Sequence, residues 1–196
     1  MKSAIDNLLL DPHGILYEEP YRLLHDEMRD TVQASTLLSI IGNGANKMSE
    51  IAARAEKAAT EISAQLNKLR DLGFIIRQLP YGEDEKKSRK GIYVVSDHLF
   101  RFHYRFVSPY ISFIELGKQD VIHSVIESQF SQYVGQFWEE LCRDFVCGNM
   151  IDNILYTKGS RWWGMLTDGT MAQLDVVAES LDRKHLLIGE CKWTRK

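Results

Sequence analysis

The sequence predicts an α+β protein, with a helical N-terminal part that ends in a β-hairpin and a C-terminal part in which one long helix precedes short strands. Three observations support this prediction. Apolar residues recur at helical spacing in successive segments between residues 31 and 72. Strand-like runs at 74–79 and 91–95 flank a charged loop. From residue 121, aromatic residues repeat at helical spacing before short apolar strands begin.

The composition is that of a folded globular protein. The 196 residues are 44% hydrophobic and 26% charged, with a formal net charge of −3, which excludes a wholly disordered or collagen-like chain. No apolar run approaches the ~18 residues that a membrane span requires, and residues 1–10 do not resemble a signal peptide. Three cysteines without such a peptide predict reduced thiols and a cytoplasmic location.

Three helices are expected in the N-terminal part, after a lead-in at residues 1–29. The first carries an apolar stripe from Thr31 and stops at Gly42. A short helix follows at about 49–55. The third begins near Ala58, and its expected core face is Ile62, Leu66 and Leu69. Three helices followed by a charged hairpin are the order of a winged helix-turn-helix domain, which we assign to residues 30–96.

The candidate nucleic-acid contacts lie mainly in the loop of this hairpin. Its basic residues are Lys86, Lys87, Arg89 and Lys90. An acidic run at 83–85 precedes them, and the third helix offers only Lys57 and Lys68 nearby, with Glu61 repelling phosphate. We therefore expect weak, sequence-tolerant binding of duplex DNA through the loop. A protein-binding module, or a small helical core without a ligand, is the alternative, because a fold does not by itself give a function.

Residues 97–120 are expected to form an aromatic connector. Five aromatic residues alternate there with Arg101, His103 and Arg105. Such interleaving is typical of stacking platforms for single-stranded nucleic acid. Aromatic residues on both faces of a helix are more typical of burial between two domains, and we favour that interpretation.

The C-terminal part, residues 121–196, contains carboxylates within apolar strands. A helix over 121–149 is followed by expected strands at 154–157, 171–179 and 185–192. Asp175 interrupts the second of these, and Glu190 and Lys192 share one face of the third because residues two apart on a strand point to the same side. An unpaired buried carboxylate is costly, so this hairpin needs a cation or a mutual network.

This order of a helix, a strand with Asp and a strand with Glu-x-Lys resembles the PD-(D/E)xK nuclease fold. The resemblance implies that Asp175 and Glu190 hold a divalent metal, Mg²⁺ or Mn²⁺, whose hard charge suits oxygen ligands. It implies that Lys192 orients or activates the attacking water and that Glu139, on the preceding helix, joins the site. A salt-bridge cluster on the sheet is the alternative.

Several further motifs resemble one family more closely. They are the segments 87–93 and 97–107, the sequence Arg161-Trp162-Trp163-Gly164, and the segment 189–193. In this order they are similar to the C-terminal region, called DUF234, of archaeal-type P-loop ATPases, from about Asp30 to the end. The resemblance implies a P-loop ATPase domain before the winged helix and a nuclease-like terminal domain.

The chain departs from that family in two ways. It has no Walker A or Walker B motif, so we expect residues 1–29 to be the tail of a missing ATPase domain, through which alone ATP would act. The nuclease-like domain is also expected to be C-terminally incomplete. Three functions stay open: a metal-dependent nuclease fragment, a DNA- or protein-binding module, and a regulator of the missing ATPase. The expected partners are DNA, that ATPase domain or a second copy of the chain, and no membrane.

Overall fold

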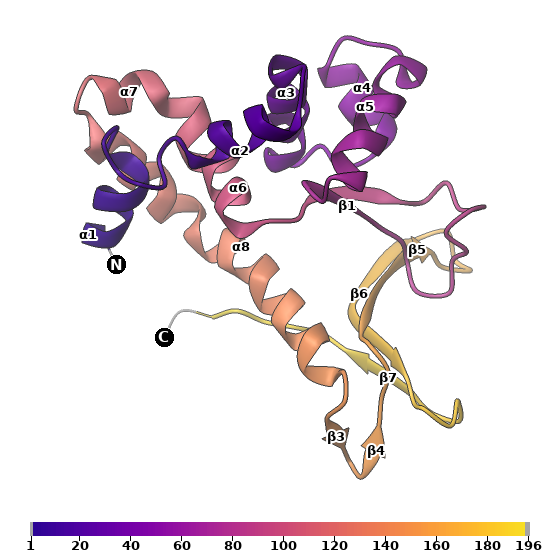
Figure 1. Cartoon of the computed structure of the whole chain (residues 1–196). Coiled ribbons are helices and arrows are strands. Elements are labelled where there is room, and N and C mark those ends of the chain that lie inside the picture. The colour runs from indigo at the N-terminus through magenta and orange to yellow at the C-terminus, as the bar shows by residue number, and fades with distance from the viewer. Residues whose placement is uncertain (1, 195–196) are drawn as a thin grey trace. The chain divides into compact units, whose positions relative to one another are not determined.

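Figure 1 shows the computed structural model of the protein, which describes residues 2–194. The fold is mixed α+β, with three small antiparallel sheets. The chain divides into two compact units, each described here by itself. The helical unit comprises the residues up to 78 and 92–126, and the sheet unit comprises 79–91 and the residues from 127 onward. Within the described part of the chain, no helix is long and apolar enough to cross a bilayer.

The helical unit contains the elements of the expected three-helix and hairpin segment. Its helices are α1 (Lys2–Ile5), α2 (Glu19–Glu27), α3 (Thr31–Gly42), α4 (Met48–Arg54), α5 (Ala59–Asp71), α6 (His98–Phe102), α7 (Ile111–Glu115) and the first part of α8 (Gln119–Val146). Short π-helical turns η1 (Asp6–Leu10) and η2 (His103–Val107) and a 3-10 turn η3 (Ser108–Tyr110) connect them. Strands β1 (Ile75–Gln78) and β2 (Ile92–Val95) pair antiparallel, with Ile75 opposite Val95.

Local sequence signals account for where these helices begin and end. The Asp30 side chain accepts a hydrogen bond from the Gln33 N–H at 3.0 Å, which caps the N-terminus of α3. Pro20 lies in the first turn of α2, where its missing N–H costs nothing. Gly73 follows α5 with a φ of +81°, a left-handed conformation that favours glycine.

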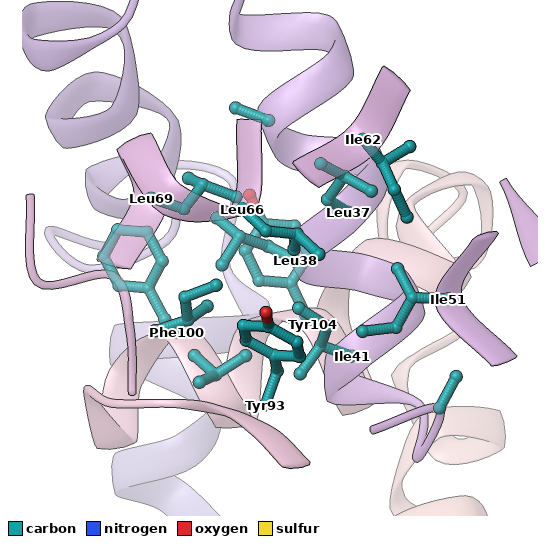
Figure 2. Packing of buried hydrophobic residues seen from close by; sticks show 14 of the residues in the cluster. Leu37, Leu38, Ile41, Ile51, Ile62, Leu66, Leu69, Tyr93, Phe100 and Tyr104 are labelled. Carbon is teal, nitrogen blue, oxygen red and sulfur yellow. The ribbon is translucent and has the colours of Figure 1, made fainter. Parts of the chain in front are cut away.

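The core of the helical unit is formed by the faces that the sequence predicts. Ile62, Leu66 and Leu69 are fully buried, which confirms the expected core face of α5. Figure 2 shows these three packed with side chains from α3, α4, β2 and the residues that follow. Tyr104 packs closely against the end of α3. A Cβ added to Gly42 would lie 2.9 Å from the Cβ of Tyr104.

The aromatic segment is part of this core. Phe100 and Tyr104 pack in it, 3% and 0% exposed, and Phe106 is also fully buried. Their rings therefore cannot stack on nucleic-acid bases, which excludes them from a single-strand platform. The expected burial is confirmed for these three rings, and Phe100 and Tyr104 pack against α3 and α5 residues of the helical unit.

The sheet unit places strands beside the C-terminal part of α8. Its strands are β3 (Met150–Ile151), β4 (Ile154–Leu155), β5 (Ser160–Met165), β6 (Met171–Glu179) and β7 (Leu186–Gly189). The order of the larger sheet is β5-β6-β7, and β6 has the bounds that the sequence predicts. The sequence analysis missed β5, and β7 ends before the expected residue 192. Beyond Gly189, the Cys191 N–H bonds the Asp175 side chain instead of the β6 backbone.

The hairpin loop at 79–91 belongs to the sheet unit. The Tyr81 N–H donates to the Arg161 carbonyl of β5 at 2.7 Å. Within the loop, the Asp84 carboxylate accepts the backbone N–H groups of Lys86 and Lys87 at 2.9 and 3.1 Å. The loop therefore has internal bonds that fix its backbone and leave the lysine side chains at its surface.

Candidate functional site

The four acidic and basic residues expected in the nuclease-like site come from three segments of the sheet unit. Glu139 lies on α8, and Asp175 lies within β6. Glu190 and Lys192 follow the end of β7. In the β6–β7 register Val176 faces Gly189 in the last pair, and Asp175 and Glu190 are the next residue of each segment. Both carboxylates therefore lie just beyond the end of the ladder, where the Asp175 side chain accepts the Cys191 N–H.

Glu139 is the acidic member of a half-buried charge cluster. Its Oε2 atom lies 3.7 Å from Nη1 of Arg143, one turn along α8, and 3.5 Å from Nη2 of Arg161 on β5. Burial raises the pKa of Glu139, the guanidinium of Arg161 opposes this rise, and the charge of Asp175 adds to it. Asp175 is therefore close enough to act on the pKa of Glu139.

Arg143 connects the helix to the sheet. Its side chain is 9% exposed, and Nη1 donates to the backbone carbonyl of Asp175 at 2.9 Å. Burial lowers the pKa of this guanidinium, and the neighbouring Arg161 lowers it further. Two arginines thus lie among acidic groups here, because Asp175 and Glu140 are near the cluster as well as Glu139. The sequence analysis did not identify either arginine, although the four-residue spacing of Glu139 and Arg143 is a signal for such a pair.

Two cysteines lie beside the same carboxylates. Cys142 and Cys191 pack against one buried cluster formed by Val146, Tyr156, Val176 and Ala178. Burial raises the pKa of Cys191 to about 12, with further contributions from a hydrogen bond between its thiol and that of Cys142 and from the nearby acidic groups. The backbone N–H of Cys191 donates to Oδ2 of Asp175 at 2.9 Å.

Glu190 and Lys192 form a separate pair. Their side chains are 75% and 73% exposed and lie 3.5 Å apart, so they share one face as predicted. Cys191 between them takes part in the buried contacts instead. Across residues 2–194, no group of three or more His, Cys, Asp or Glu side chains is placed to hold a metal ion. As arranged, the carboxylates therefore do not form a set of metal ligands.

The candidate nucleic-acid residues differ in how they are paired. Lys57 lies 3.2 Å from Glu61, and Lys90 lies 2.6 Å from Glu83. The remaining three, Lys86, Lys87 and Arg89, are exposed. No ion pair involves these three side chains within the described residues. They form the unpaired basic surface of the hairpin loop.

Comparisons with known proteins give a family resemblance without a function. Residues 103–196 match the model of the DUF234 family, described as archaea bacterial proteins of unknown function. The chain is also similar to an uncharacterized protein of Methanocaldococcus jannaschii. The identity is 28% over 174 residues, which are 87% of this chain and 38% of that relative. The chain thus spans little more than a third of the relative's length. No solved structure matches the chain significantly.

The resemblance to DUF234 is therefore supported for the region that carries the candidate site. The matched residues include Glu139, Asp175, Glu190 and Lys192. They also include the two arginines and two cysteines that surround the first two of these carboxylates.

Proposed function

We propose that the protein is a nucleic-acid-binding regulatory region, in which residues 30–96 form a winged helix that contacts duplex DNA through its hairpin loop. One observation carries the proposal. Lys86, Lys87 and Arg89 are exposed without ion-pair partners among the described residues, while the Asp84 carboxylate beside them is engaged by backbone N–H groups. Such side chains can neutralise phosphates and release counterions.

The third helix of the expected winged helix argues for weak and sequence-tolerant binding. Just before α5, the helix expected to face the bases, Lys57 is paired with Glu61 of that helix. Asn67 on this helix is exposed and carries an amide that could read a base edge. Phosphate contacts position a protein on DNA but carry little sequence information. The loop would therefore supply most of the affinity.

The setting of this region is part of the proposal. The sequence motifs resemble the C-terminal region of archaeal-type P-loop ATPases, and the archaeal relative is much longer than the match. We place the region next to an ATPase domain, which would bind ATP and whose activity the DNA contact would regulate. The whole protein's activity is thus proposed from the resemblance alone.

The salt dependence of DNA binding tests the proposal. Fluorescence anisotropy with a labelled 20-base-pair duplex is measured between low and moderate salt for the protein and for Lys86→Ala/Lys87→Ala/Arg89→Ala. Each lost phosphate contact lowers the slope of log K against log salt by about 0.9, so the triple variant should lose a slope of about 2–3. The backbone bonds to Asp84 survive these changes, so the loop keeps its shape.

A matched control removes the same charge elsewhere. Lys118, Lys158 and Arg183 are exposed basic residues outside the loop, and their triple alanine variant should keep the slope of the unchanged protein. Equal slopes for all three proteins would overturn DNA binding through the loop and favour a protein partner.

A metal-dependent phosphodiesterase is the second candidate, as the resemblance to PD-(D/E)xK nucleases implies. It is favoured by the position of Asp175 and Glu190, each one residue beyond the last β6–β7 pair, and by the charge of Asp175 acting on Glu139. Binding of Mg²⁺ or Mn²⁺ would require Glu190 to leave its exposed pair with Lys192. Metal-dependent cleavage of duplex or single-stranded DNA tests this candidate.

A further inference from the structure

The outer edge of β7 is an unpaired edge of the larger sheet. Strand β7 ends the order β5-β6-β7, and within residues 2–194 no strand pairs with its other side. An edge of this kind offers free backbone N–H and carbonyl groups to another chain. Two large apolar side chains lie on the exposed face of the same strand, since Leu186 and Ile188 are 50% and 56% exposed.

We propose that this edge pairs with the β7 edge of a second copy, antiparallel and in a register centred on Leu187. A two-fold axis perpendicular to the sheet keeps the exposed faces of both copies on one side. In this register Leu186 of one copy faces Ile188 of the other, and Lys184 of one copy faces Glu190 of the other. The two-fold axis generates a second, equivalent example of each pair. Both apolar side chains gain a partner, and both charged pairs are of opposite sign.

The sequence of the strand selects this register over its neighbours. A shift of the centre by one residue toward the N-terminus sets Ile188 opposite Lys184, an apolar side chain opposite a charged one. A shift by one residue toward the C-terminus sets Leu186 opposite Glu190, again apolar opposite charged. Cross-strand pairs stabilise an antiparallel ladder when apolar side chains face each other or charges are opposite. The register centred on Leu187 is therefore the one that gives both kinds of favourable pair.

The two charged residues are available for this contact. Lys184 is exposed, and no ion pair involves its side chain within the described residues. Glu190 has an exposed pair with Lys192 at 3.5 Å, which water screens and which contributes little to stability. Exchanging that pair for a contact with a second copy costs little. The occupant that fits this edge is thus a second copy of the chain.

Charge reversal with rescue tests the proposed register. The dimer fraction of the chain is measured by sedimentation equilibrium over a range of concentrations. Lys184→Glu and Glu190→Lys should each weaken dimerisation on the order of tenfold, because each creates two like-charged pairs across the axis. The double variant Lys184→Glu/Glu190→Lys restores two opposite-charged pairs and should recover the dimer.

A control variant and two outcomes decide the test. Lys158→Glu changes the charge by the same amount at an exposed position outside the strand and should leave the dimer unchanged. A monomeric wild-type chain at all concentrations would overturn the proposal. A dimer that neither single variant weakens, or that the double variant does not restore, would show that another surface or register joins the copies. Circular dichroism verifies that each variant is folded.

Discussion

The Asp175 side chain accepts a hydrogen bond from the backbone N–H of Cys191, at 2.9 Å between Oδ2 and N. The bond lies where the β6–β7 ladder stops, one residue pair beyond Val176 and Gly189. It holds the segment after β7 against β6 and occupies one oxygen of a carboxylate expected to bind metal. The Asp175 carboxylate therefore has a structural role, and it is also the group expected to bind a metal ion.

The substitution Asp175→Asn separates these two roles. The amide oxygen can still accept the Cys191 N–H, so we expect the fold to be kept. The lost negative charge should abolish any rise in Tm caused by Mg²⁺ or Mn²⁺, because a ligand stabilises the folded state only if it binds there. The change in Tm is measured by thermal unfolding with and without about 5–10 mM Mg²⁺ or Mn²⁺.

The companion variant is Lys192→Ala, which should leave the metal-dependent rise in Tm unchanged and remove cleavage. An equal rise in Tm for Asp175→Asn and the wild-type chain would show that metal binds elsewhere. No rise in the wild-type chain would leave Asp175 with its structural role alone.

The contact between Cys142 and Cys191 predicts a specific cross-link. In a Cys147→Ser background, oxidised glutathione should form an intramolecular disulfide between the two thiols, with release of two reduced glutathiones. Burial raises the pKa of Cys191 to about 12, so its thiolate is scarce near neutral pH and the reaction should accelerate as the pH rises. Mass spectrometry of the intact protein should detect the loss of two hydrogen atoms.

The control for this cross-link is Cys142→Ser in the same background. It should stop at a mixed disulfide with glutathione or stay unmodified. Rapid intermolecular disulfides in place of the intramolecular one would contradict the described contact.

The pH dependence of stability should reveal His103. It is 2% exposed, and its Nε2 atom has no hydrogen-bond partner within the described residues. Burial lowers its pKa from 6.5 to about 4. Between these pH values the unfolded chain binds a proton that the folded protein excludes, so stability falls as the pH falls through this window. Above pH 6.5 the imidazole is neutral in both states and contributes no pH dependence.

The variant His103→Leu should remove this contribution. We compare the free energy of unfolding of this variant with that of the wild-type chain. As the pH falls from 7 to 4, the difference in favour of the variant should grow by about 3 kcal/mol. Urea unfolding followed by the helical circular dichroism signal measures the difference. His13→Leu, at an exposed position, should show no such growth. A constant difference across the window would mean that His103 titrates normally.

Local patterns were sufficient to predict the helices α3, α4, α5 and α8 and the strand β6. Thr31 and Gly42 were expected as the ends of α3 because capping and glycine signals lie in the sequence itself. Strand β5 was missed because its Trp-Trp-Gly sequence has no alternation of apolar and polar residues. Its strand conformation depends on pairing with β6, a contact that is distant in the sequence.

The candidate site was predictable in part for the same reason. The proximity of Glu139 and Asp175 follows from the order of helix and strands, whereas the ion pair of Glu190 with Lys192 lies beyond the end of β7. The partnership of Arg161 with Glu139 could not be read from the sequence, because it requires β5 to lie beside α8. The end of β7 at Gly189 also depends on a tertiary bond.

Two glycines of the sheet unit should respond in opposite ways to alanine. A Cβ on Gly159 would lie 2.9 Å from the carbonyl oxygen and 3.0 Å from the Cα of Arg143, so it would push against the backbone of α8. Backbone cannot move aside as a flexible side chain can, and overpacking of this kind costs about 1–3 kcal/mol. On α8 itself, a Cβ on Gly135 would meet nothing closer than the Cβ of Trp193 at 4.0 Å. Alanine there should stabilise by about 1 kcal/mol, because glycine is a poor helix former.

Tryptophan fluorescence can follow this experiment in the sheet unit alone, because all four tryptophans of the chain lie in it. In urea unfolding, the midpoint of Gly159→Ala should fall and that of Gly135→Ala should rise. The double variant should be close to the sum of the two, since the glycines have no neighbour in common. A Gly159→Ala midpoint equal to that of the wild-type chain would show that the segment before β5 does not press on α8 at Arg143. The packing of this segment against α8 would then not account for the position of Arg161 beside Glu139.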